Sequence, residues 1–320
     1  MNAPYREKKV IYCILNPQLP FQTVRISKGF LSDGRPATDI AKNNPDSILY
    51  KPEDILVELI EETSSKTENK KWMLSPFIIT SKDSGTFYFP DQLLYKTADI
   101  ELDTLTLQTQ KYKIRVTNKI TNQVSEASSN LVGRNFRIRN PFLENPGDPL
   151  VFRFSTRNKT EVKIDIPTNA ALIEASLSWN IRVVKEANGI ADTATETWQM
   201  SGPGFLGIAQ SSTQANGAIG PGNFWRFLQD EVVKRGNANV KNRKILGGQM
   251  LVSTANNEYS TYKEVNGNYN PITQSTPIYT NVSNGLGVVC SINQRTFKTL
   301  LDLSVRDSVA IRVPEFKLIK

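Results

Sequence analysis

The chain has 320 residues and no histidine, and its 39 Lys and Arg residues outnumber its 31 Asp and Glu residues, giving a net charge of +8. The absence of histidine excludes Ser-His-Asp and Cys-His catalysis and histidine-ligated zinc. The basic residues are scattered and are not interleaved with the aromatic residues of an RNA-binding strand, so we expect no nucleic-acid partner. The length predicts about two domains, each with its own core.

The N-terminal part has the pattern of a β-sandwich. Val10–Leu15 is apolar at nearly every position, which predicts a strand covered on both faces, and the alternation over Thr23–Ser27 predicts a half-buried strand. Further short strands with turns between them are expected at Ile55–Ile60, Trp72–Thr80, Thr86–Phe89, Leu102–Gln108 and Lys111–Asn118. Without a convincing helix, residues 1–133 are predicted to form an Ig-like or transthyretin-like sandwich.

A proline-rich segment, Asn140–Pro149, predicts a boundary, and residues 134–320 are assigned to a second β-sandwich, fibronectin-III-like or related. This domain is predicted to contain one helix near 223–235, with Asn223 as its N-cap, apolar residues at helical spacing and Gly236 at its end. The tail, Val309–Ile319, has a β-like pattern. The predicted fold class is therefore all-β, mainly strand with one helix.

The two cysteines, Cys13 and Cys290, lie near opposite ends of the sequence and fall in different predicted domains. A disulfide requires Cα atoms within about 7 Å of each other. We therefore expect two unpaired thiols that pack as small buried side chains.

Two sets of residues are candidates for ligand binding. Asp99, Glu101 and Asp103 alternate and would share one face of a strand, where their oxygens are weak candidates for Ca²⁺ ligands, although the EF-hand spacing is absent. Trp198, Phe205 and Trp225 flank a Gly-rich stretch and are candidates for stacking on a sugar, with packing in the core as the alternative. The spacing of glycines at 202–207 lacks the strand and helix of a dinucleotide site, so no cofactor is expected.

Several segments together resemble an uncharacterised exported lipoprotein family of the Bacteroidota. The resemblance is carried by VIYCILNPQ at 10–18, QTVRISKGF at 22–30, NPDSI at 44–48, LLYKT at 93–97, EYSTYKEVN at 258–266 and YTNVSNGLGV at 279–288. It implies a surface lipoprotein of unknown function whose signal peptide and lipidated cysteine are missing from this chain. Cys13 lies within a predicted strand and is not the lipidated residue.

From this resemblance we expect a non-enzymatic outer-membrane or cell-surface lipoprotein, facing the periplasm or the cell exterior. It would be a protein- or glycan-binding accessory module with an outer-membrane protein complex as partner, such as a SusC/SusD-type transporter. One alternative is a structural adhesin or fimbrial-type subunit that accepts or donates a strand. A second alternative is a carboxylate-based glycoside hydrolase.

The resemblance also implies O-glycosylation at Asp-(Ser/Thr)-aliphatic triplets, which exported proteins of such bacteria carry. The hydroxyl side chains of the four triplets in the chain are Ser47, Thr104, Thr193 and Ser308. The alternative is that these pairs serve as turn and capping residues.

Overall fold

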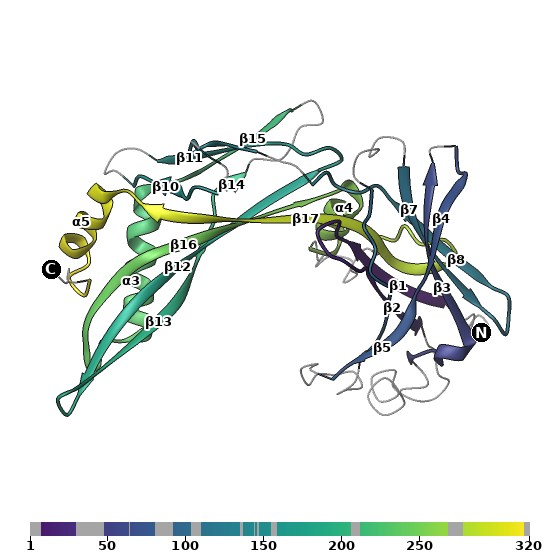
Figure 1. Ribbon diagram of the computed structural model, residues 1–320, viewed down its shortest axis with the longest axis horizontal. Coiled ribbons are helices and arrows are strands. Elements are labelled where there is room, and N and C mark those ends of the chain that lie inside the picture. Colours follow the sequence, from purple (N-terminus) through teal and green to yellow (C-terminus); the bar gives the residue numbers. More distant parts are fainter. Residues whose placement is uncertain are drawn as a thin grey trace, which may run out of the picture. The chain divides into compact units, whose positions relative to one another are not determined.

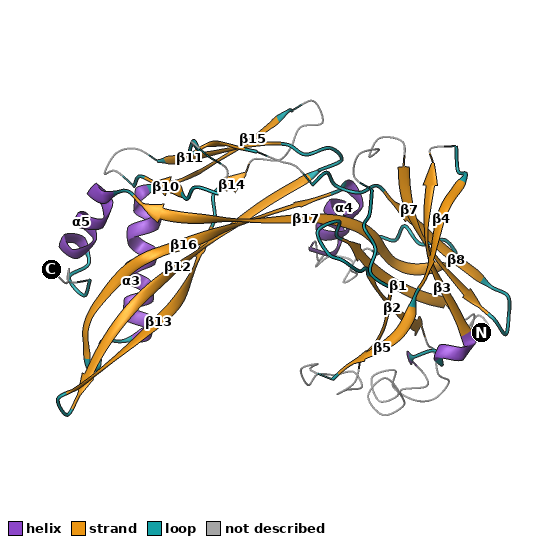
Figure 2. Cartoon of the chain, in the orientation of Figure 1, coloured by secondary structure: helices purple, strands orange, loops and turns teal. Residues whose placement is uncertain are grey.

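The computed structural model describes residues 8–29, 48–63, 65–80, 92–103, 110–134, 137–143, 145, 147–154, 159–205, 212–267 and 278–316. The chain is mostly strand and forms several sheets (Figures 1 and 2), which confirms the all-β sandwich class. The strands are β1 (Lys8–Leu15), β2 (Thr23–Gly29), β3 (Ile55–Thr63), β4 (Glu68–Met73), β5 (Ser75–Ile79), β6 (Gln92–Lys96), β7 (Gln110–Asn118), β8 (Val124–Ser129), β9 (Ile138–Asn140), β10 (Leu150–Phe152), β11 (Thr160–Asp165), β12 (Leu172–Ala187), β13 (Ile190–Ser201), β14 (Gly204–Phe205), β15 (Gln214–Ile219), β16 (Val240–Ala255) and β17 (Gly285–Leu301). The helices are η1 (Pro52–Asp54), α3 (Pro221–Arg235), α4 (Asn257–Gly267) and α5 (Leu303–Arg312).

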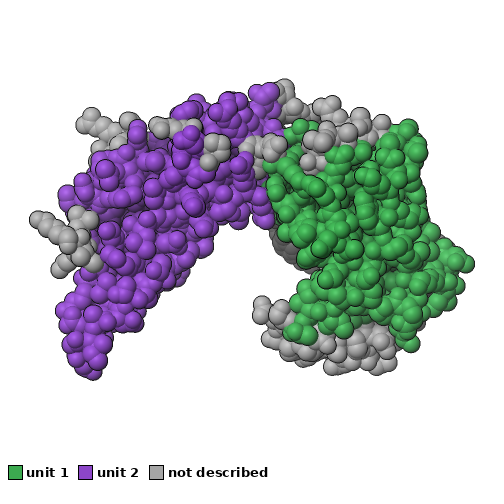
Figure 3. Space-filling view, in the orientation of Figure 1, with its two compact units in different colours: residues 1–134, 168–171, 255–293 green, residues 135–167, 172–254, 294–320 purple. Residues whose placement is uncertain are grey.

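The chain divides into two compact units (Figure 3). Unit 1 consists of residues 1–134, 168–171 and 255–293, and unit 2 of residues 135–167, 172–254 and 294–320. The first segment of unit 1 ends at residue 134, next to the predicted domain boundary between residues 133 and 134. The prediction of a continuous second domain over 134–320 is wrong, because 255–293 belongs to unit 1. The reason is a long-range pairing: β1 runs parallel to β17, from Lys9 opposite Gly285 to Leu15 opposite Ser291.

Unit 1 is a sandwich of two sheets. The first contains β1, β2, β6, β5 and the start of β17, and the second has the strand order β4-β3-β7-β8. Its core combines side chains of both sheets, including Ile11, Leu15 and Val24 of the first and Val57, Leu59, Ile114 and Val116 of the second. β1 and β2 form the expected antiparallel hairpin. The expectation that β1 is covered on both faces is wrong, because its side chains alternate and Tyr12 and Ile14 are exposed.

Unit 2 is built around long antiparallel strands. β13, β12 and β16 lie side by side, followed by β17, and the smaller sheet has the order β14-β15-β11-β9. Alternate residues of the long strands, among them Trp179 and Ile181, form one buried cluster with the small sheet and with α3 and α5. The figures show α3 lying along the long strands (Figure 2).

The single predicted helix corresponds to α3, which begins at Pro221 and is preceded by Gly220 as N-cap, so the choice of Asn223 as N-cap was wrong. Gly236 ends the helix with a φ of 69°, as expected. Two further helices were not predicted. α4 lies in the segment that returns to unit 1, and α5 occupies part of the tail that was expected to be β. Asp302 begins α5, because its carboxylate accepts a hydrogen bond from Ser304 N.

Candidate functional site

A cavity of about 620 Å³ lies in unit 2 beside the Gly-rich segment that the sequence singled out. Four elements form it: the end of β13, β14 through Gly204, β15 and α3. Its lining includes Gln199, Met200, Gly202, Ile219, Asn223, Arg226, Phe227, Asp230 and Glu231. We call it the α3 cavity.

The sequence of α3 explains why polar groups face this cavity. Phe224, Leu228 and Val232 are buried in the core of unit 2. A second set, Asn223, Arg226, Phe227 and Asp230, recurs at positions i, i+3, i+4 and i+7, so these residues share another face of the helix. That face presents an amide, a guanidinium group, a carboxylate and an aromatic ring to one space.

Gly202 shapes the opposite wall. A Cβ atom at this position would lie 2.0 Å from the carbonyl oxygen of Ala175, a distance that no side chain tolerates. The glycine therefore allows the end of β13 to pass close to the backbone of the neighbouring strand.

One of the two acids in the α3 cavity is already neutralised. The Glu231 carboxylate binds Arg235 (Nε–Oε2 3.0 Å) and Lys234 (Nζ–Oε1 3.3 Å). Arg235 also contacts Glu196, which accepts a hydrogen bond from Trp198 Nε1. Arg226 and Asp230 are exposed, and neither forms an ion pair with another described residue. They are the charged groups that are available to a ligand.

Two of the three stacking residues proposed from the sequence are not on the surface. Trp198 and Trp225 are buried in the core of unit 2, as the alternative of core packing predicted, and Phe205 is placed in β14 but its side chain is outside the described part. The aromatic residue that does line the cavity is Phe227, half-buried, with its ring 6.4 Å from that of Trp198 and nearly perpendicular to it. Its helical spacing with Asn223 and Asp230 was the signal that could have identified it.

The predicted acidic strand at Asp99, Glu101 and Asp103 is wrong, because this segment is irregular. Glu101 forms an ion pair with Arg134 at 2.9 Å, and the backbone N–H of Asp103 donates to the Tyr112 hydroxyl. Among the described residues, no three Asp, Glu, His or Cys side chains are grouped in a way that could hold a metal ion.

The proposed glycosylation sites differ in their surroundings. Ser47 and Thr104 lie outside the described residues. Thr193 is exposed on β13, whereas Ser308 is half-buried in α5 and its hydroxyl donates to the carbonyl oxygen of Ser304 at 2.8 Å.

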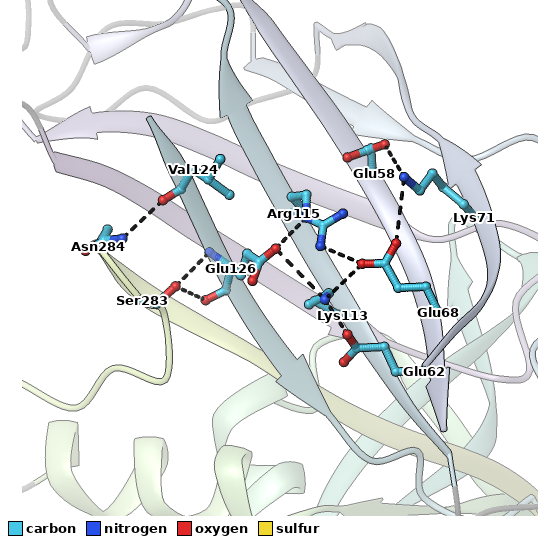
Figure 4. A network of polar contacts seen from close by, with 10 residues as sticks. All are labelled: Glu58, Glu62, Glu68, Lys71, Lys113, Arg115, Val124, Glu126, Ser283 and Asn284. Carbon is cyan, nitrogen blue, oxygen red and sulfur yellow. Dashed lines mark hydrogen bonds and ion pairs between the residues drawn. The ribbon is translucent and has the colours of Figure 1, made fainter. Parts of the chain in front are cut away.

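A network of ion pairs lies on the sheet β4-β3-β7-β8 of unit 1 (Figure 4). Arg115 binds Glu68 and Glu126, Lys113 binds Glu62, and Lys71 binds Glu58 at 3.2 Å. The hydrogen bond from Arg115 holds the pKa of Glu68 below its ordinary value. Because each base has an acid beside it, the network stabilises the sheet and leaves little unpaired charge for a ligand.

The edge of the same sheet is also occupied. The Ser283 hydroxyl donates to the carbonyl oxygen of Glu126 at 3.0 Å, and Asn284 Nδ2 donates to that of Val124 at 3.3 Å (Figure 4). These bonds satisfy carbonyl groups on β8 that an added strand would need.

A second cavity, of about 870 Å³, is lined by residues of unit 2 that include Phe142, Val151, Arg153 and Lys159. Arg153 is held by Asp302 at 3.2 Å. Residues 144, 146 and 155–158, which border its lining in the sequence, are outside the described part. The α3 cavity is therefore the better-defined site.

No protein-family model matches the chain, and no curated protein matches it. Among solved structures, the crystal structure of CBD12 from CALX1.2 aligns over 88% of this chain and 98% of that chain, with 9% sequence identity and a TM-score of 0.20. In the described part of the chain, the helices are too short or too polar to cross a bilayer.

Proposed function

We propose that the protein is a non-enzymatic binding module that holds a glycan in the α3 cavity. The observation that supports this is the lining: amide, guanidinium and carboxylate groups converge beside the half-buried ring of Phe227. Sugars offer hydroxyl groups to planar polar side chains and a C–H face to an aromatic ring, so this combination suits them.

The proposal includes a location at the outer membrane or cell surface, with an outer-membrane protein complex such as a SusC/SusD-type transporter as partner. Its support is the family resemblance of the segments around the N-terminal hairpin and at 279–288. A lipid anchor in front of the present chain would supply the attachment.

The alternative of a glycoside hydrolase has weaker support in the cavity. A hydrolase needs two carboxyl groups about 5–10 Å apart on either side of the scissile bond, one of them protonated. Asp230 and Glu231 are consecutive on a helix and therefore do not face each other. The Glu231 carboxylate is already bound by Arg235 and Lys234.

The alternative of an adhesin or fimbrial-type subunit is favoured by one specific observation. β13 is the edge strand of its sheet, and most of its residues from Ile190 to Thr197 are exposed. A strand of a neighbouring subunit could add to this edge. Concentration-dependent polymers, lost on substitution of Thr195 by proline, would favour this function over glycan binding.

Binding to a glycan array that contains neutral and acidic oligosaccharides, followed by calorimetry, tests the proposal. We expect Arg226→Ala and Phe227→Leu each to weaken the binding of the best oligosaccharide about tenfold. Arg25→Ala, an exposed arginine of unit 1, is the matched control and should bind as the wild type does. The proposal fails if no oligosaccharide binds or if Arg25→Ala has the same effect.

A further inference from the structure

One face of the long strands of unit 2 is not covered by any other described helix or sheet of that unit. Trp179, Ile181 and Val183 of β12 point into the core cluster that α3 and α5 share. The residues between them, such as Asn180 and Arg182, point the other way and are half-exposed. We call the surface formed by these outward positions of β13, β12, β16 and β17 the open face.

Uncharged polar groups dominate the open face. Thr197 lies opposite Asn180 and Thr195 opposite Arg182, and the Thr197 hydroxyl donates to Asn180 Oδ1 at 3.1 Å. The aromatic residues of these four strands, Trp179, Trp198 and Phe297, all belong to the core cluster instead. The face thus offers rows of hydroxyl and amide groups without a stacking platform.

Between the two ends of the long strands, the charged residues named at outward positions of the open face are basic. Arg182, Lys244 and Lys298 lie at outward positions of three neighbouring strands, and Lys244 and Lys298 are exposed. The acids at outward positions of β12, Glu174 and Glu186, lie near its two ends, and Glu186 is paired with Lys241 at 3.5 Å. The basic groups between them therefore attract an anion.

Among the described residues, two buried polar atoms at outward positions of these strands, Arg182 Nε and Asn242 Oδ1, form no hydrogen bond. Leaving such groups unpaired costs free energy, so each is stabilised when its side chain turns toward a ligand on the open face that carries donor and acceptor groups.

We propose that the open face binds an acidic polysaccharide. Carboxylate groups of the polymer lie against Arg182, Lys244 and Lys298, and its hydroxyl groups bond with the threonine and asparagine side chains. A nucleic acid is a poorer fit, because single strands require aromatic side chains for their bases and duplexes require a denser set of cations. The α3 residues that line the α3 cavity lie on the helix-covered side of the strands, and the end of β13, with Gln199 and Ser201, borders both surfaces. The two proposals rest on different charged residues and can fail separately.

The test measures binding of the full chain to polygalacturonate, a linear polyanionic glycan, by biolayer interferometry at low and high salt, with neutral dextran as comparison. We expect binding to polygalacturonate alone, weakened by salt and weakened about tenfold by the double substitution Lys244→Gln/Lys298→Gln. Arg182→Gln should weaken it further. The matched control is Lys163→Gln/Lys234→Gln, which removes the same charge from exposed lysines away from the open face.

Circular dichroism and the melting temperature establish that each variant is folded, and Arg25→Ala, at an exposed arginine of unit 1, should leave polygalacturonate binding intact. The proposal is overturned if polygalacturonate does not bind, or if the control pair lowers binding as much as the open-face pair. Tighter binding of duplex DNA or of anionic lipid vesicles than of polygalacturonate would also overturn it.

Discussion

Cys13 and Cys290 lie on neighbouring parallel strands but point to opposite faces of the sheet. Cys13 is opposite Val289 and packs in the core of unit 1, whereas Cys290 is opposite Ile14, an outward position. The Cys290 thiol contacts the carbonyl oxygen of Cys13 at 3.6 Å. The sequence-based prediction of two buried, unpaired thiols thus agrees with the structure, but its premise of different domains is wrong.

Both thiols should be unreactive in the folded protein. Burial raises the pKa of Cys13 well above its ordinary value and that of Cys290 to about 12, so almost no thiolate exists near neutral pH. We expect a thiol reagent such as DTNB to label neither cysteine in native protein and both in urea. Intact mass should be the same with and without reductant; a gain of two hydrogens on reduction would contradict the arrangement of the two strands.

The pairing of β1 with β17 shows which part of the fold could not be predicted from the sequence. Local patterns were sufficient for the hairpin of β1 and β2 and for α3, because alternation and helical spacing are properties of adjacent residues. Nothing local indicates that β1 pairs with β17, more than 270 residues later, and this pairing moves 255–293 into unit 1. For the site, the sequence identified the Gly-rich segment beside the α3 cavity. It also suggested Trp198 and Trp225 as ligand-binding residues, but both are buried in the core of unit 2.

Tyr112 should be more important for stability than Tyr95. The Tyr112 hydroxyl donates to the nearly fully buried carboxylate of Glu61 at 2.9 Å, and accepts from Asp103 N. Tyr112→Phe should lower the free energy of unfolding by about 2 kcal/mol, because the buried carboxyl group of Glu61 loses a hydrogen-bond donor. Tyr95 is the matched control: its buried hydroxyl has no partner in the structure, so Tyr95→Phe should be neutral or stabilising. Urea titrations of both variants measure the difference, and equal losses would contradict this account.

Asp302 should stabilise α5 in a pH-dependent way. Hydrogen bonds from the Ser304 hydroxyl and N–H, at 2.7 and 3.1 Å, hold the pKa of Asp302 below its ordinary value of 3.8. A lowered pKa in the folded state means that the stabilisation is present above pH 3.8 and is lost as the pH falls through the folded value. At pH 7, Asp302→Ala should cost about 1 kcal/mol.

The control for this prediction is Asp302→Asn, which keeps an acceptor oxygen for Ser304 and should cost less than the alanine variant. The difference between wild type and Asp302→Ala should shrink on acidification, as followed by thermal melts with tryptophan fluorescence. A difference that stays constant from pH 7 to pH 3 would show that the carboxylate does not cap the helix in its ionised form.

Gly248 in β16 should be sensitive to substitution for a simple steric reason. A Cβ atom there would lie 2.1 Å from the carbonyl oxygen of Ser178 and 3.0 Å from Cε3 of Trp179, so β16 and β12 could not keep their spacing. We expect Gly248→Ala to lower the free energy of unfolding by about 3 kcal/mol or to prevent unit 2 from folding.

Two other glycines serve as comparisons. Gly236 has open space around it but a φ of 69°, so Gly236→Ala should lower the free energy of unfolding by about 1 kcal/mol. Gly222→Ala, in open space near the start of α3, should be neutral or stabilising. Urea unfolding of the three variants gives the ranking directly, and a Gly248→Ala protein as stable as Gly222→Ala would show that the long strands of unit 2 do not pack as described.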